Sequence, residues 1–124
     1  MRPRRLASIA IATDGSGAAT VFSEAFDGRI LAIRVTRGTM TSGAVDITVT
    51  VDGSAQAVLT ITNLAADTWY YPRVPVQDEA GANALFAAGG TSQRDYVPVA
   101  NDRLKFVIAQ GGASKAGTAD VIVG

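Results

Sequence analysis

The stretch RLKFVIAQGGASKAGTADVIVG, residues 103–124, places glycines and a lysine between two apolar runs, a composition that raises the question of phosphate binding. A phosphate loop needs glycine N–H groups around the anion, a lysine directly after the last glycine, and a helix that follows. Here Lys115 precedes Gly117, and the strand-like TADVIVG comes next. The segment therefore favours the turn of a hairpin over a nucleotide site.

Other residue types offer little catalytic chemistry. The chain has no histidine and no cysteine, and so lacks the usual base near neutral pH, a Ser-His-Asp triad and thiolate metal ligands. Asp78 and Glu79 are adjacent, so on an extended chain they point to opposite sides and indicate a solvated turn. Three Asp-Gly pairs lack the alternating oxygen ligands of a calcium loop and indicate turns. We expect no enzymatic activity, no metal and no cofactor.

Two features suit binding better than catalysis. The segment DTWYYPR places three aromatic residues in a row, and at least one ring must face away from the core if the segment is extended. Trp, Tyr and Arg are enriched at interface hot spots, and stacked aromatics also bind sugars or bases. A strand whose rings flank the sheet edge is the alternative. The second feature is MRPRR, whose arginines suit a tether to an acidic neighbouring surface or to nucleic acid, with a frayed, solvated terminus as the alternative. The candidate interface comprises Arg2, Arg4, Arg5, Trp69, Tyr70, Tyr71 and Arg73.

Composition limits the class of protein. A chain of 124 residues is close to the commonest domain size, so we expect one domain over residues 1–124, with residues 1–4 as an extended N-terminal arm. Eleven basic residues balance eleven acidic ones, which gives no net field to attract nucleic acid. No apolar run approaches the ~20 residues of a membrane span, and the start does not resemble a secretory signal. We expect neither a membrane nor a nucleic-acid partner.

The surrounding pattern is all-β, because Val, Ile and Thr recur at a period of two between turns that contain glycine. Residues 79–90, EAGANALFAAGG, fit one or two helical turns or an irregular loop equally. The expected strands are 5–12, 18–23, 29–37, 44–51, 55–62, 68–71, 94–99, 103–110 and 118–123. The Asp-Gly pairs at 14–15, 27–28 and 52–53 punctuate them as turns.

Register arguments predict two hairpins. In the central one, a loop of Asp52-Gly53-Ser54 with a bulge would pair Val49 with Ala57 and Ile47 with Leu59, so that both apolar rows share one face. In the last one, pairing Phe106 with Val121 would leave residues 111–116 as the loop. The expected rows are Leu104, Phe106 and Ile108 on one strand and Ala119, Val121 and Val123 on the other.

The ending of the chain combines a basic-apolar strand, AQGG, a lysine, Gly-Thr and a terminal VIVG. Earlier, ATDGSGAAT is followed by GRILAI, and LFAAGG precedes VPVANDRLK. Together these segments resemble a family of small proteins encoded among the virion structural genes of tailed bacteriophages. No catalytic residues come with it.

The resemblance implies a structural role and an antiparallel, jelly-roll-like β-sandwich of about eight strands with at most one short helix. We expect a capsid decoration or cement protein on the capsid surface of the virion. Its partners would be the major capsid protein or other virion proteins, and it would form a homo-oligomer, with a trimer as the expected assembly. The alternatives are a neck or tail component of the phage and a carbohydrate-binding module that uses the aromatic row.

Overall fold

The computed structural model describes residues 2–124 as an antiparallel, all-β structure. The described part of the chain has twelve strands, of which β1, β8 and β9 contain two residues each. The strands are β1 (Arg4–Arg5), β2 (Ile9–Ala12), β3 (Ala19–Phe22), β4 (Phe26–Thr36), β5 (Val45–Val51), β6 (Ala57–Leu64), β7 (Thr68–Tyr70), β8 (Val74–Pro75), β9 (Arg94–Asp95), β10 (Val97–Asp102), β11 (Leu104–Ala109) and β12 (Ala116–Val123).

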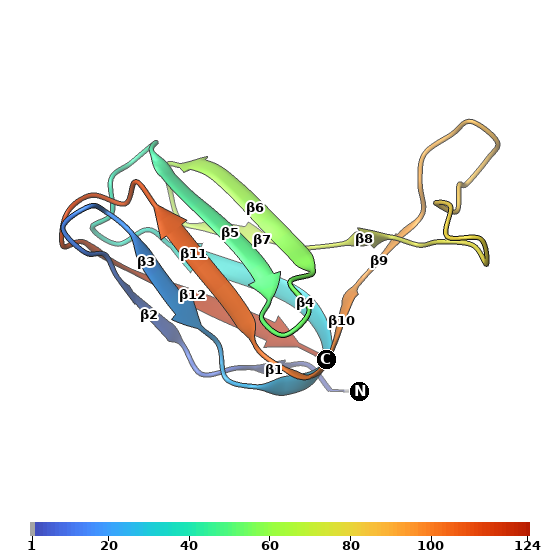
Figure 1. Ribbon diagram of the computed structural model, residues 1–124, viewed down its shortest axis with the longest axis horizontal. Helices are drawn as coiled ribbons and strands as arrows, with labels where there is room; N and C mark the ends of the chain where they lie inside the picture. The colour runs from blue at the N-terminus through green and yellow to red at the C-terminus, as the bar shows by residue number, and fades with distance from the viewer. Residues whose placement is uncertain (1) are drawn as a thin grey trace.

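The strands form two main sheets that face each other (Figure 1). Sheet A has the order β1-β12-β4-β10, with β2 also paired to β12 and β7 also paired to β4. Sheet B has the order β3-β11-β5-β6, and β8 pairs with β9 in a separate two-stranded ribbon. The predicted antiparallel β-sandwich is confirmed, whereas a jelly-roll-like connectivity stays a prediction.

The core lies between the two sheets and follows the period of two in the sequence. In β11 the buried residues alternate with outward ones, as they do in β5. The most deeply buried large side chains are aliphatic apart from Phe106 and Met40, and each is less than 2% exposed. Branched side chains suit such a pleated, half-buried surface, which is why these segments form strands.

The central hairpin has the predicted bulge but a different register. Val49 pairs with Leu59 and Ile47 with Ile61, two residues beyond the predicted partners, and the register shifts between Val49 and Thr50. The extra residue turns Val58 into the core, at 8% exposed, and leaves Ala57 outside. Strict alternation along the strand predicted Ala57 to be in the buried row, and the bulge shows that this prediction was wrong.

The last segment is not a hairpin. Strand β11 pairs with β3 and β5 in sheet B, whereas β12 pairs with β1, β2 and β4 in sheet A. The connection that contains GGASK therefore crosses from one sheet to the other. Both predicted rows are buried, but they lie on opposite walls of the core instead of side by side. Period-two patterning identifies the buried face of a strand without specifying its partner.

The crossing loop is held by a buried threonine. The Thr13 hydroxyl donates to the carbonyl of Gly112 at 2.6 Å and accepts from the N–H of Lys115 at 2.7 Å. Thr13 is 7% exposed, and its own N–H donates to the carbonyl of Lys115. The backbone groups that a phosphate would need are partly used within the protein, and Lys115 is exposed.

Three further sequence predictions are corrected or refined. The expected strand 5–12 is divided into β1 and β2, and the expected strand 94–99 into β9 and β10. Asp27-Gly28 is not a turn but lies inside β4, where the Asp27 carboxylate accepts from the N–H of Asn101. Residues 79–90 contain no helix, so the irregular-loop alternative holds.

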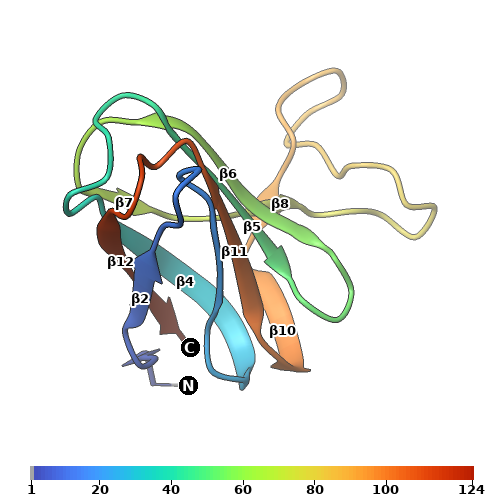
Figure 2. The same ribbon diagram turned by 60° about the vertical axis from the view of Figure 1, so that its left-hand side comes forward.

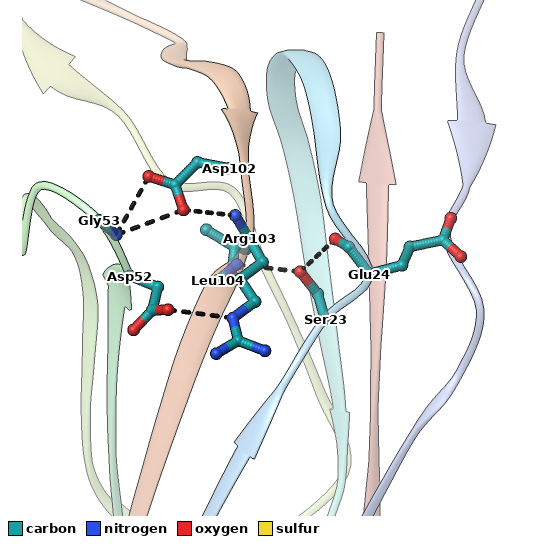
Figure 3. A network of polar contacts seen from close by, with 7 residues as sticks. All are labelled: Ser23, Glu24, Asp52, Gly53, Asp102, Arg103 and Leu104. Carbon is teal, nitrogen blue, oxygen red and sulfur yellow. Dashed lines mark hydrogen bonds and ion pairs between the residues drawn. The ribbon is translucent and has the colours of Figure 1, made fainter.

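A polar network joins three connections at one end of the sandwich (Figure 3). The Asp102 carboxylate accepts from the N–H groups of Gly53 and Arg103, and the Arg103 Nε donates to Asp52 at 3.0 Å. The Ser23 hydroxyl accepts from the N–H of Leu104 at 2.9 Å and donates to the carbonyl of Glu24. These groups satisfy one another, which indicates a structural role in closing the core.

Candidate functional site

The most distinctive feature outside the core is a projecting hairpin, residues 74–95, which runs from β8 to β9. It extends away from both sheets in each view of the molecule (Figures 1 and 2). No residue between 74 and 95 is fully buried, and of these residues Val74, at the base, packs against the core, so the rest of this described segment does not help to fill it. A segment that contributes little to burial still costs conformational entropy to order, which points to a role outside the fold.

The projecting hairpin leaves the sandwich where sheet A has a gap. Strand β7 pairs with β4 at residues 33–35, and β10 pairs with β4 at residues 26–30, so the two lie end to end along one side of β4. The chain departs after β7 and returns at β10. Arg73 stands at this gap and donates to the carbonyl of Leu31 at 3.3 Å.

Stacked side chains hold the base of the projecting hairpin. The guanidinium of Arg73 lies 4.0 Å from the centre of the Tyr96 ring, and that of Arg29 lies 5.1 Å from it. Arg73 also donates to the carbonyl of Pro72 at 2.7 Å. Contacts between a guanidinium and an aromatic face are attractive and directional, so they orient the projecting hairpin relative to sheet A.

Two loops form the far end of the projecting hairpin. Between the two loops, three backbone hydrogen bonds link Val76, Ala84 and Gln93. The N–H of Val76 donates to the carbonyl of Gln93, that of Gln93 to Ala84, and that of Ala84 to Val76. The acidic loop, residues 78–82, is built on the Asp78 carboxylate, which accepts from the N–H groups of Ala80 and Ala82.

The apolar loop, residues 85–91, is the second of the two. It exposes Phe86 at 75% and Leu85 at 38%. Its first turn is closed by the N–H of Phe86, which donates to the carbonyl of Thr91 at 3.0 Å. An aromatic side chain this exposed at the end of an extension suits an interface anchor.

Sheet A presents an arginine-rich outer side, here termed the arginine face. In β4, Arg34 lies between the buried Ile33 and Val35 and so points outward, toward Trp69 on β7, with 5.9 Å between the guanidinium and the ring centre. Arg29 lies opposite the exposed Pro98, and Arg5 opposite Ile122. The arginine face comprises Arg5, Arg29, Arg34 and Arg73 with Trp69 and Tyr96.

The arginine face carries a local positive charge although the whole chain is neutral. Two carboxylates lie beside these arginines. Asp120 lies directly opposite Arg34, is 9% exposed and accepts from the Ser8 hydroxyl at 2.5 Å, and Asp27, two residues before Arg29 in β4, accepts from the N–H of Asn101. In the part of the chain that the structure describes, none of the four arginines takes part in an ion pair. Unpaired guanidinium groups beside aromatic rings favour an anionic partner.

The predicted interface residues separate into groups. Trp69, at 46% exposed, and Arg73 lie on the arginine face with Arg5, and Tyr71, at 63% exposed, follows β7. Tyr70 points inward and packs against the core, so the three rings do not form one platform. Arg4 pairs with Val123 and lies 3.8 Å from the Glu24 carboxylate.

The predicted N-terminal arm over residues 1–4 therefore includes the first residue of a strand. Arg4 belongs to β1, whereas Arg2 and Pro3 precede it and are exposed. Met1 lies outside the described residues. The cluster of basic residues thus begins on an exposed segment and continues into the edge of sheet A.

Sequence reasoning missed Arg29, Arg34 and Tyr96. Strict alternation puts Arg29 and Arg34 on opposite faces because they are five residues apart. A bulge in β4 opposite Ile122 and Val123 inserts Leu31 and brings both arginines to the outer side. The signal available in the sequence was the arginine between two apolar residues in AIRVT, which marks Arg34 as outward.

Within residues 2–124, no three acidic side chains gather closely enough to hold a metal ion, and no pocket was found on the surface. No helix within the described range could cross a membrane. Comparison with protein-family models, with curated proteins and with solved structures found no match.

Proposed function

We propose that this chain is a structural protein of a bacteriophage virion, and that it decorates the capsid and stabilises the head through protein–protein contacts. The observation that carries the proposal is the projecting hairpin, whose exposed Phe86 has no place in the chain's own core. An extension of this kind suits a contact with a neighbouring subunit. The family resemblance of the sequence supports the same role.

The partners follow from this role. The chain would contact the major capsid protein or another virion protein, and it would itself form a homo-oligomer, with a trimer as the proposed state. The location would be the outer surface of the capsid, and the sandwich would have jelly-roll-like connectivity. The arginine face would meet either an acidic patch of the capsid or a second copy of the chain.

The decisive experiment is a cryo-EM reconstruction of the purified particle, together with the copy number of the chain by quantitative mass spectrometry. A decoration protein occupies many equivalent positions over the shell. Copies found only at the portal vertex or on the tail would contradict decoration and establish the neck or tail alternative. Absence of the chain from the particle would overturn both.

A second candidate is a carbohydrate-binding module, which the exposed Trp69 beside Arg34 favours. A flat aromatic ring flanked by a guanidinium can stack on a sugar and donate hydrogen bonds to its hydroxyls. Glycan-array binding that is lost in Trp69→Ala, with an unchanged circular dichroism spectrum, would support this function. Binding that survives Trp69→Ala would contradict it.

A further inference from the structure

The projecting hairpin and the arginine face are complementary in charge. From Val74 to Gln93 the only charged residues are Asp78 and Glu79, so the far end of the projecting hairpin is negative. The Asp78 carboxylate is anchored by two backbone N–H groups, and both Asp78 and Glu79 are exposed. The arginine face offers four guanidinium groups, and the two carboxylates beside them are already hydrogen-bonded, Asp120 to Ser8 and Asp27 to the N–H of Asn101.

The two surfaces are also complementary in their apolar groups. The apolar loop exposes Phe86 and Leu85, and the arginine face exposes the ring of Trp69, with Tyr71 beyond the end of β7. Aromatic anchors supply affinity at the centre of an interface, whereas charged pairs at its rim set the register and exclude wrong partners. A surface with both kinds of complementarity specifies one docking geometry.

The projecting hairpin does not fold back onto the arginine face of its own chain. In both views its loops lie well away from β4, β7 and β12 (Figures 1 and 2). The stacking of Tyr96 with Arg29 and Arg73 fixes its base. The complementary surface that its loops can reach is therefore the one on another copy.

We propose that the projecting hairpin of one copy docks on the arginine face of a second copy, with the acidic loop against the guanidinium groups and Phe86 against Trp69. The contact joins two different surfaces, so it is a head-to-tail interface that closes into a ring or continues as a filament. This inference deepens the proposed structural role by naming the second copy as a partner.

A charge-exchange experiment tests the interface by analytical ultracentrifugation of the isolated chain. The hairpin variant carries Glu79→Arg and Ala80→Arg, which reverse the charge of the acidic loop and keep the Asp78 carboxylate that holds it, and the face variant carries Arg5→Glu and Arg34→Glu. We expect the wild type to self-associate and each variant alone to associate at least tenfold more weakly, because like charges then meet at both sides of the contact. Lys105→Glu on sheet B is the matched control, with association unchanged.

Mixing the two variants distinguishes a direct contact from damage to the fold. In the mixture, each contact between one variant and the other joins opposite charges. The dissociation constant of this two-copy contact is therefore expected to return to within about threefold of wild type for two close charge pairs, whereas a closed ring of three would keep one mismatched contact. Circular dichroism and thermal unfolding check that each variant is folded. A folded pair that fails to associate when mixed, or a wild type that stays monomeric at millimolar concentration, would overturn the interface.

The result is independent of the proposed location. Self-association is measured on the isolated chain, whereas the virion role is measured on purified particles. A monomeric wild type whose arginine face binds an oligonucleotide, with binding lost in the face variant, would replace the second copy with a nucleic acid. A chain that forms the ring but is absent from the particle would keep the interface and remove the virion role.

Discussion

Phe106 lies on β11 at the centre of the core, where it is fully buried, whereas its neighbour Val107 points outward and is 39% exposed. We predict that Phe106→Asp destabilises the fold by at least about 3 kcal/mol, because it removes a large apolar side chain and buries a charge without a partner. Chemical denaturation followed by tryptophan fluorescence measures the free energy of unfolding.

Val107→Asp is the matched control for this substitution. It introduces the same carboxylate one residue away on the outer side of sheet B, and we expect less than about 1 kcal/mol of destabilisation there. Equal losses from the two substitutions would show that the alternation along β11 has been assigned incorrectly. Little loss from Phe106→Asp would contradict its position in the core.

The pKa of the Asp14 carboxyl depends on backbone hydrogen bonds in the loop that follows it. Its carboxylate accepts from the N–H groups of Ala18 at 3.1 Å and Ser16 at 2.8 Å, and these bonds hold the pKa of Asp14 below its ordinary value of 3.8. A lowered pKa in the folded state stabilises the fold above the unfolded pKa, and this stabilisation is lost as the pH falls through the folded pKa.

The prediction for Asp14 is therefore a carboxyl that titrates below 3.8 in the folded chain, measured by NMR of its side-chain carbon. The amide protons of Ser16 and Ala18 should shift with the same midpoint, because they donate to the titrating group. Asp14→Asn removes the titration and serves as the control. A midpoint above the ordinary value would contradict these hydrogen bonds.

At the scale of the strand, the period-two pattern predicted burial well and pairing poorly. The rows through Phe106 and Val121 are both buried, as the alternation predicted, yet the two strands belong to different sheets. Burial depends on the local sequence, whereas partner choice depends on whether the connecting loop turns back or crosses the core. The GGASK segment can do either, and the buried hydroxyl of Thr13 that holds the crossing lies about a hundred residues away.

The arginine face could likewise be predicted only in part from the sequence. Trp69, Arg73 and Arg5 were predicted as interface residues from the segments DTWYYPR and MRPRR. Arg29 and Arg34 become neighbours on one side only because Leu31 is bulged in β4. A bulge reverses the alternation beyond it, and nothing in RILAIRVT marks its position. Tyr96 was missed because its role depends on the gap in sheet A that β7 and β10 leave between them.

Thr13 gives a test of the crossing loop as an element. Thr13→Val keeps the shape of the side chain but leaves the carbonyl of Gly112 and the N–H of Lys115 without their hydroxyl partner. We expect a loss of about 1–3 kcal/mol in the free energy of unfolding, the usual cost of unsatisfied buried polar groups. Thermal unfolding with calorimetry measures it.

Two controls accompany the Thr13 substitution. Thr13→Ser keeps the hydroxyl and should recover most of the stability. Lys115→Ala removes only an exposed side chain and should leave folding and assembly nearly unchanged. A Lys115→Ala chain that folds but no longer assembles would show that the loop has a role that its backbone contacts do not account for.

On the scale of the whole molecule, a zero net charge conceals a separation of charge. Arginines gather on the outer side of sheet A, and the two carboxylates of the acidic loop lie at the far end of the projecting hairpin. Interactions between exposed charges are screened over about 10 Å at 0.1 M salt. The separation therefore favours head-to-tail association at low salt without any net field around the molecule.

The sandwich and the projecting hairpin should be separable. We predict that replacement of residues 77–92 by Asn-Gly leaves the sandwich folded, with the free energy of unfolding changed by less than about 1 kcal/mol, because the removed residues bury no core side chain. The two-residue turn would join Val76 to Gln93, and the N–H of Val76 already donates to the carbonyl of Gln93 at 2.8 Å. The same replacement should abolish self-association and incorporation into particles. Calorimetry measures the stability and ultracentrifugation the self-association. A shortened chain that still assembles would place the interface on the sandwich itself. The uncharged edge strand β6 would then be the first place to look, because an edge strand has backbone groups that are free to pair with another strand.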